Sequence, residues 1–375
     1  MRAISATSHH PEPYRAGLEL GAALARMTPE VVLLFHSGPQ EHAADLVEGL
    51  NDALDNPNLL VIGSSADGVF QARQSHEPAT VALGINGEGS VRWYLVSEPG
   101  LRAQPQLAVR RAWQRLAKRG LIDLVLLLSD GGSDSAQLEQ ALQEEIPIPV
   151  VGGVAGRWPE SFVYANRELL RDSVEMLGCH GSFAFDIALA HQLPTLGLPG
   201  RITAAEGCHV EFIDDLPASD FVQAQLSQTV PVVDAADVAV NVVNPAAPQE
   251  QTLRSLSSTV GVGLHLHGGV NNGQWLQLCH IQPQALRQQA QTLEERAEMA
   301  SFEPRLALLL SCSERQRWLG ALPGPEAAVL TAQFGQQLPL LGIALANLFS
   351  PHKDQRGYSR NLLHNLSASL LLLGD

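Results

Sequence analysis

The chain has 375 residues, of which 45% are hydrophobic and 17% charged, and its formal net charge at pH 7 is −15. This composition supports a sizeable buried core and argues against a disordered chain. Since an acidic chain without a basic block binds polyanions poorly, we expect neither nucleic acid nor a membrane surface as a partner.

Four cysteines lie far apart without a C-x-x-C motif, at Cys179, Cys208, Cys279 and Cys312. This spacing argues against a disulfide framework or a structural zinc site and favours a reducing compartment. The first residues lack the apolar segment of a signal peptide, and no apolar stretch approaches the roughly 18–20 residues that span a bilayer. We therefore expect a cytoplasmic protein.

A continuous apolar run at 31–37 (VVLLFHS) ends in a small polar residue. Such a run predicts a strand that is buried on both faces. Apolar residues at helical spacing follow in 43–54, and further strands are predicted at 58–65 (NLLVIGSS) and 79–87 (ATVALGING). The order is strand, helix, strand, strand.

The same order recurs from residue 124. The run 124–130 (LVLLLSD) precedes a helical segment at 133–145, where Asp134 is a candidate N-cap. The segments 148–158 (IPVVGGVAGRW) and 173–181 (SVEMLGCHG) then match the two later strands of the first copy.

A third, more divergent copy starts at 306–312 (LALLLSC) and continues through 338–351 (LPLLGIALANLFSP) to 362–373 (LLHNLSASLLLL). Buried strands need helices over both faces, so the class we predict is α/β. The repeated units should form layered, mostly buried sheets that helices cover, arranged in two halves.

Between the copies, helices are predicted at 105–120, 216–226 and 283–300, and short strands within 227–283. The Pro- and Gly-rich stretch 191–201 is the predicted boundary. We expect one domain of two repeats at 1–200 and a second domain, with the divergent repeat, at 201–375.

Small polar residues end several of these strands. In open α/β sheets, ligands bind beyond the carboxyl ends of the strands, where small residues leave room and hydroxyls and backbone amides satisfy polar atoms. Turn and cap residues have the same composition, so a purely structural role stays open for each position. Taken together, they favour a ligand pocket.

Five segments in serial order resemble the FIST family, a sensory domain of bacterial signalling proteins. They are VVLLFHSG, VIGSSADGVF with its counterpart VVGGVAGRW, LPASDFVQAQL, SCSERQ and LHNLSASLLLL, and the resemblance covers residues 28–372. SCSERQ resembles the family's Cys-x-x-Arg signature at Cys312 and Arg315, and the last segment its closing His364-Asn365 pair. Family members carry Gly-Glu-Ile near 342–351 (GIALANLFSP), where this chain has approximately Asn347-Leu348-Phe349.

The resemblance implies a sensor of small, amino-acid-like ligands. Without a fused output domain it would act on a separate histidine kinase, cyclase or similar signalling protein, and a homodimer stays open. Some FIST-like proteins are similar to haem-dependent nitric oxide sensors, so haem is the alternative cofactor; none of the 13 histidines is singled out by spacing.

The predicted ligand-binding set combines the strand ends with the motif residues. An arginine suits a carboxylate because its planar fork binds both oxygens, and Asp130 suits an ammonium group. The set is Ser37, Ser64, Ser65, Ser129, Asp130, Arg157, Cys312, Arg315, His364 and Asn365.

An enzyme is the third alternative, with Cys312 or Ser65 as the nucleophile. The nucleophile elbow G-x-S-x-G is absent from the sequence, and a reactive cysteine needs a depressed pKa. His265 and His267 share one face of a predicted strand, but a third metal ligand is not evident nearby. We therefore predict a protein that is not an enzyme and has no catalytic or metal-ligating residues.

Overall fold

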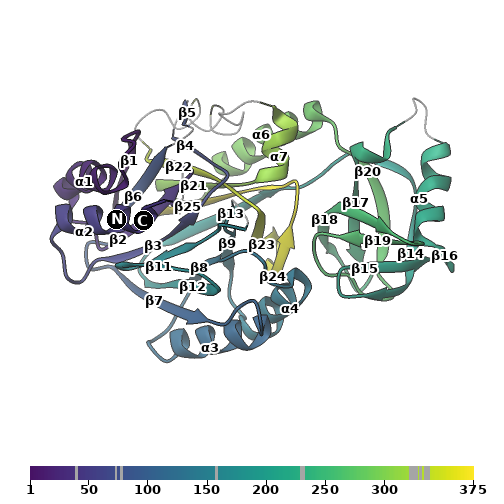
Figure 1. The fold of residues 1–375 in the computed structure, drawn as a ribbon, viewed down its shortest axis with the longest axis horizontal. Helices are drawn as coiled ribbons and strands as arrows, with labels where there is room; N and C mark the ends of the chain where they lie inside the picture. The colour runs from purple at the N-terminus through teal and green to yellow at the C-terminus, as the bar shows by residue number, and fades with distance from the viewer. Residues whose placement is uncertain are drawn as a thin grey trace.

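The computed structural model describes the chain except residues 39–40, 72–73, 77–78, 157–158, 229–232, 321–327, 329–331 and 333–337. Three α/β units pack together and a fourth sheet lies to one side of them (Figure 1). The predicted α/β class is therefore confirmed.

The first unit leads with a strand and a helix that the sequence analysis missed, ahead of the predicted strand–helix–strand–strand order. β2 and β3 are parallel, β6 is antiparallel to β2, and β1 pairs with β6. In chain order the elements are β1 (Arg2–Ser8), α1 (Pro13–Leu24), β2 (Val31–His36), α2 (Ala43–Leu54), β3 (Leu60–Ser65) and β6 (Thr80–Asn86).

Two glycines bring the helices of this unit together. A Cβ at Gly17 would lie 2.2 Å from the Leu46 oxygen, and one at Gly49 would lie 2.1 Å from the Tyr14 oxygen. Since real Cβ atoms do not approach a backbone oxygen so closely, the packing of α1 on α2 requires glycine at both positions.

The second and third units repeat all six elements. The second comprises β7 (Val91–Pro99), α3 (Pro105–Ala117), β8 (Leu124–Ser129), α4 (Ser135–Glu145), β9 (Val150–Val154) and β12 (Ser173–Gly181). The third comprises β13 (Ala184–Ala190), α6 (Pro283–Glu298), β21 (Pro304–Cys312), α7 (Ser313–Leu319), β22 (Leu340–Leu345) and β25 (Ala368–Gly374). Asp134 caps α4 as predicted, because its side chain accepts hydrogen bonds from the Ala136 and Gln137 amides.

Each unit also lends a hairpin to another unit's sheet. The hairpin β4 (Gly68–Gln71)–β5 (Gln74–His76) pairs with β22, β10 (Val163–Ala165)–β11 (Glu168–Leu170) pairs with β3, and β23 (Asn347–Asp354)–β24 (Gly357–His364) pairs with β9. The exchange is cyclic and links the three units into what we call the ring.

An apolar core fills the inside of the ring. It joins side chains from all three sheets, among them Leu33, Leu126 and Leu308, each at most 6% exposed. Burial of a leucine side chain contributes about 1.5–3 kcal/mol to folding, so this shared core holds the units together.

The fourth sheet is inserted between β13 and α6 of the third unit. Its strands run in the order β14-β20-β17-β18-β19-β15-β16, and an additional pairing of β14 with β15 closes six of them into a barrel. We call residues 195–280 the inserted barrel. Its elements are β14 (Thr195–Glu206), β15 (His209–Ile213), β16 (Leu216–Pro217), α5 (Ala218–Ser227), β17 (Val238–Asn244), β18 (Ala247–Val260), β19 (Gly263–Leu266) and β20 (Trp275–His280).

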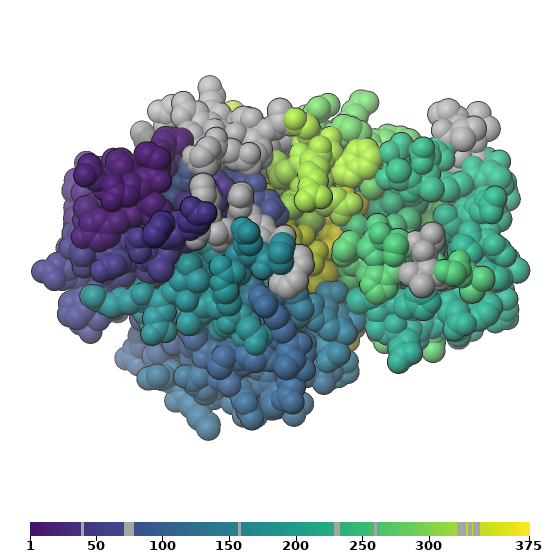
Figure 2. Space-filling view, in the orientation of Figure 1, coloured from purple at the N-terminus to yellow at the C-terminus, as the bar shows by residue number. Residues whose placement is uncertain are grey.

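The barrel has its own apolar core, which includes Phe221 of α5 and Val240 of β17. In the space-filling view it protrudes to one side, and residues of the third unit lie between it and the first two (Figure 2). Within the described residues, no helix has the length and apolarity needed to cross a bilayer.

Candidate functional site

The carboxyl ends of β3, β9 and β22, one strand from each unit, meet at one place inside the ring. The Gly156 amide after β9 donates to the Ser65 oxygen of β3 at 3.1 Å, and the Asp67 amide after β3 donates to the Ala344 oxygen of β22 at 2.9 Å. The Ala346 amide after β22 donates to the Val154 oxygen of β9, also at 2.9 Å. Each strand end therefore contacts the other two.

The predicted serine and cysteine residues near this junction are buried. Ser65 Oγ donates to the Gly156 oxygen at 2.9 Å, and Cys312 Sγ donates to the Ala346 oxygen at 3.3 Å. Ser64 Oγ and Ser129 Oγ have no hydrogen-bond partner among the described residues. The remaining serine, Ser37, bonds the Ala79 backbone at the end of β2.

Asp130 is also fully buried, and its carboxylate is already satisfied. It accepts hydrogen bonds from Ser161 Oγ and from the Gly131 and Asp172 amides, and it pairs with Arg102. This network fixes the turn after β8, so the carboxylate has protein partners in the position where we predicted a ligand's ammonium group.

Arg315 ties two helices together. From α7 its guanidinium donates to Gln289 Oε1 and to the Leu286 oxygen of α6, both at 2.6 Å, and it is fully buried. The second predicted arginine, Arg157, lies outside the described residues.

The closing His-Asn pair lies between the ring and the barrel. His364 Nε2 lies 3.1 Å from the Ser350 oxygen, while Asn365 accepts the Ser255 amide of β18 at 3.1 Å. Asn365 Nδ2 donates to Asn347 Oδ1 at 2.6 Å.

All nine described members of the predicted set are at most 3% exposed, and none of them lines either of the two large clefts on the described surface. Ser64, Ser65, Ser129 and Cys312 lie around the junction of the strand ends. The other described members serve separate contacts within the fold.

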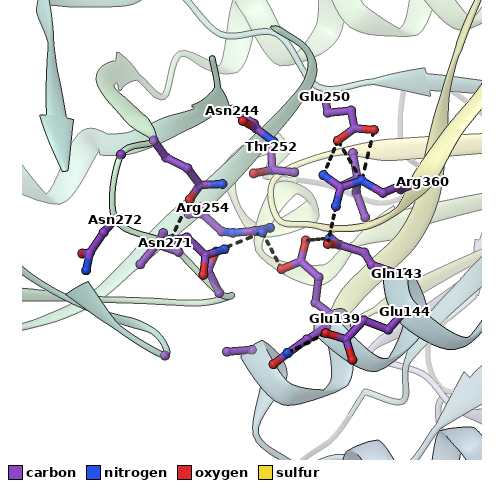
Figure 3. Close-up of a pocket in the computed structure, with 18 of the residues that line it drawn as sticks. Glu139, Gln143, Glu144, Asn244, Glu250, Thr252, Arg254, Asn271, Asn272 and Arg360 are labelled. Atoms are coloured by element: carbon purple, nitrogen blue, oxygen red, sulfur yellow. Dashed lines mark hydrogen bonds and ion pairs between the residues drawn. The ribbon is translucent and has the colours of Figure 1, made fainter. Parts of the chain in front are cut away.

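A polar cleft opens between the ring and the barrel (Figure 3), with a volume of about 650 Å³. α4 forms one wall, β18 and the 269–274 loop form the other, and Arg360 of β24 lies at the side. Its polar side chains are Glu139, Gln140, Gln143, Glu144, Asn244, Glu250, Thr252, Arg254, Asn271, Asn272, Gln274 and Arg360.

A buried ion pair joins the two walls. Arg254 Nη2 lies 2.6 Å from Glu139 Oε2, and the two side chains are 2% and 6% exposed. Arg254 also donates to the Leu363 oxygen of β24, and the Leu363 amide donates to Glu139 Oε1 at 3.1 Å. Three elements from the second unit, the third unit and the barrel therefore meet at one charge pair.

Gly268 covers the remaining edge of this arginine. A Cβ at Gly268 would lie 2.6 Å from Arg254 Nε, and its backbone has φ of +130°, a region that L side chains rarely adopt. Arg254 Nε has no hydrogen-bond partner within the described part of the chain.

A second ion pair lies nearer to solvent. Arg360 Nη2 lies 2.5 Å from Glu250 Oε2, and the arginine side chain is 50% exposed. Arg360 Nη1 also reaches Gln143 Oε1 at 3.4 Å. With Glu144 exposed on the opposite wall, the cleft offers cationic, anionic and amide groups to the same small volume.

Sequence reasoning missed this cleft because its residues come from distant segments with ordinary surface composition. The one local signal is the alternation along β18, where Glu250, Thr252 and Arg254 share a strand face. In a polar strand this pattern also describes a solvated face, so burial of the arginine follows only from the fold.

The structure thus defines the class as a three-unit α/β protein with an inserted barrel and a polar cleft between them. A model of the FIST N domain matches residues 6–215, more than half of the chain. The chain belongs to the FIST family, a family of sensory domains, and the resemblance predicted from the motifs is confirmed.

Two solved structures match the chain over nearly its whole length. One is described as a cyanuric acid hydrolase that arose by structural concatenation, with 8% identity, a TM-score of 0.39 and coverage of 100% of this chain and 99% of that one. The other is the cyanuric acid hydrolase of A. caulinodans, with 10% identity, a TM-score of 0.35 and coverage of 99% and 98%. No curated protein matches the chain.

Proposed function

We propose that this protein senses a small, zwitterionic, amino-acid-like ligand in the cleft between α4 and the barrel. The observation that carries the proposal is the presence of both charge signs and several amides around one volume of about 650 Å³. Ligand pockets of about 300–1,000 Å³ with a few convergent polar groups are typical of small-molecule sites.

Each part of such a ligand has a complement on the walls. Arg360 binds Glu250 through Nε and Nη2, and its half-exposed guanidinium keeps Nη1, 3.4 Å from Gln143 Oε1, for a charge-assisted hydrogen bond to a ligand carboxylate. Glu144, which accepts a hydrogen bond from Gln140 at 2.7 Å, suits an ammonium group. Asn271 and Asn272 suit polar atoms of the ligand's side chain.

The position of the cleft supports a signalling role. Its walls belong to the ring and the barrel, so a ligand that contacts both favours one arrangement of the two bodies over the others. The joint at Arg254 and Glu139 holds the same two bodies together. We propose that the arrangement is read by a separate partner, such as a histidine kinase or a cyclic-dinucleotide enzyme.

We also propose that the protein is not an enzyme. Burial raises the pKa of the Cys312 thiol to about 11, which leaves little thiolate at neutral pH. Ser65 Oγ bonds backbone groups rather than a histidine.

Thermal unfolding with the free amino acids and related zwitterions tests the ligand proposal, because a ligand that binds only the native state stabilises it by mass action. We expect one class of zwitterion to raise the melting temperature, and its analogues without the carboxylate or the amine to lose the effect. Absence of any shift at millimolar concentration would contradict the proposal.

Two variants locate the site. Arg360→Gln and Glu144→Gln should each weaken binding at least about tenfold, since each removes a charge-assisted hydrogen bond worth about 1.5–3 kcal/mol. The matched control is Arg110→Gln, because Arg110 forms an ion pair with Glu145 at 2.7 Å outside the cleft lining. Equal affinities in all three variants would place the ligand elsewhere.

A further inference from the structure

Three histidine side chains are packed together where the chain passes from the three-unit ring into the barrel. The ring centroids of His191 and His352 are 4.4 Å apart, those of His352 and His364 are 5.3 Å apart, and those of His191 and His364 are 5.9 Å apart. His191 directly follows β13, while the other two belong to β23 and β24. We call these three residues the histidine cluster.

Backbone oxygens determine which nitrogen carries the proton in the imidazoles of His352 and His364. His352 Nε2 lies 2.7 Å from the Gln251 oxygen of β18, and His364 Nε2 lies 3.1 Å from the Ser350 oxygen. Since a carbonyl oxygen only accepts, each Nε2 donates, and the neutral ring leaves Nδ1 without a proton. Nδ1 of His191 and Nδ1 of His364 are buried and have no partner among the described residues.

Most of the charged groups around the cluster are already paired, and Asp354, which lines the same cleft as His191 and His352, accepts a backbone amide. On β18, Glu250 pairs with Arg360 and Arg254 pairs with Glu139 of α4; on β13, Asp186 pairs with Lys353 of β23. Asp354 of β23 accepts the Arg356 amide. On the adjoining helices, Arg296 of α6 lines the same cleft as His191 and His352. The remaining charged residues of these helices are Arg287, Glu294, Glu295 and Glu298 of α6 and Glu314, Arg315 and Arg317 of α7.

Burial therefore disfavours the charged form of all three rings. Together with the neighbouring His352, it lowers the pKa of His191 to about 3. Burial also lowers the pKa of His352, and that of His364 falls well below its usual range through burial and the adjacent histidines and Arg254.

The position of the cluster links it to the joint between the barrel and the ring. Within the described residues, no group of three or more His, Cys, Asp or Glu side chains is arranged to hold a metal ion. The cluster instead joins the barrel to the ring, because His191 begins the chain segment that leads into β14 and the Gln251 oxygen belongs to β18.

We propose that the histidine cluster is an acid-sensitive latch. While its imidazoles are neutral, it holds β18 and the 191–194 segment on the three-unit ring, and it releases them when the protein is acidified. β18 also carries Glu250, Thr252 and Arg254 of the polar cleft, so release changes that cleft. This inference goes beyond the proposed function, because it concerns the response to protons alone and needs no ligand.

The direction follows from proton linkage. Above pH 7 the rings are neutral in both the closed and the released states, so pH has no effect. As pH falls below the ordinary histidine pKa of about 6.5, the released rings bind protons and the closed ones do not. At pH 5, 1.5 units lower, each released histidine favours release by a factor of up to about 30.

Hydrogen exchange read by mass spectrometry tests the latch in the full chain without ligand. Protection factors, corrected for the intrinsic pH dependence of exchange, are compared at pH 7.5 and pH 5.0 for β18 and for β2 of the ring. We expect β18 to lose at least tenfold more protection than β2 at the lower pH. An equal change in both strands overturns the proposal.

The double variant His191→Gln/His352→Gln should strongly reduce this selective loss, since glutamine keeps an amide donor for the Gln251 oxygen but does not titrate, and only His364 of the cluster remains. Circular dichroism at pH 7.5 first checks that it folds; if it does not, the single variant His191→Gln carries the test and should reduce the loss. The matched control is His265→Gln, an exposed histidine of the same barrel, which should behave as the unsubstituted protein. An unchanged loss in the cluster variants overturns the proposal.

Discussion

The ring and the inserted barrel are stabilised by different groups. In the ring, β2 and β8 are buried and almost wholly apolar along their length. In the barrel, the part of β18 that meets the ring buries Glu250, Thr252, Arg254 and Ser255. Apolar burial responds little to pH or to a polar ligand, whereas buried ions, amides and histidines respond to both. The difference suggests that the ring is the scaffold and the contact with the barrel is the responsive part.

The largest effect is expected from a substitution that breaks the charge pair between the ring and the barrel. Glu139→Ala leaves Arg254 buried without its partner, and such a change costs about 3–5 kcal/mol. We expect urea unfolding to show an early transition in which the barrel separates before the ring unfolds.

The control for this variant is Glu144→Ala, which removes an exposed carboxylate from the same helix. It should change the free energy of unfolding by less than about 0.5 kcal/mol. A single, unshifted unfolding transition for Glu139→Ala would mean that the ion pair does not hold the two regions together.

A cavity in the core of the ring should destabilise the whole molecule. Leu308→Ala removes a 1% exposed side chain from the core that all three sheets share, at a cost of about 2–5 kcal/mol. The expected result is a lower midpoint of unfolding for every probe, without an early transition. The matched control Leu121→Ala changes a 73% exposed leucine and should leave the midpoint unchanged. Loss confined to the barrel would contradict the assignment of the ring as the scaffold.

The ring contains one titratable group with the opposite pH response to the histidine cluster. Burial raises the pKa of Glu175 to about 7, against partial compensation by hydrogen bonds from Ser97 and Ser173. Because the folded pKa lies above the unfolded one, stability falls as pH rises from about 4.5 to 7, by up to about 3 kcal/mol.

Glu175→Gln should therefore stabilise the protein at pH 8 and have little effect at pH 4. Urea unfolding at the two pH values measures this difference. If the substitution changes the free energy of unfolding by the same amount at both pH values, the pKa of Glu175 does not differ between the folded and unfolded states.

Much of the ring could be predicted from the sequence because its strands carry their signal locally. The runs at 31–37, 124–130 and 306–312 became β2, β8 and β21, and the helical spacing at 283–300 became α6 with Leu286 and Leu293 buried. The leading strands β1, β7 and β13 were missed because their exposed or half-buried positions break the apolar run.

The site was harder to predict, for a physical reason. Hairpin exchange brings strand ends from three units to one point, and nothing in a local segment encodes which sheet a hairpin joins. Asp130 and Arg315 were selected for their charge, yet in the fold each is satisfied by nearby protein groups. The cleft depends on contacts between α4 and β18, which lie more than 100 residues apart, so no spacing rule identifies it.

Native-state hydrogen exchange at pH 7.5 across a series of low urea concentrations tests the central claim most directly, since it measures the free energy of opening for each region separately. The account predicts that β14, β18 and β20 of the barrel exchange through an opening of lower free energy than β2, β8 and β21 of the ring. One common opening free energy for all six strands would contradict it.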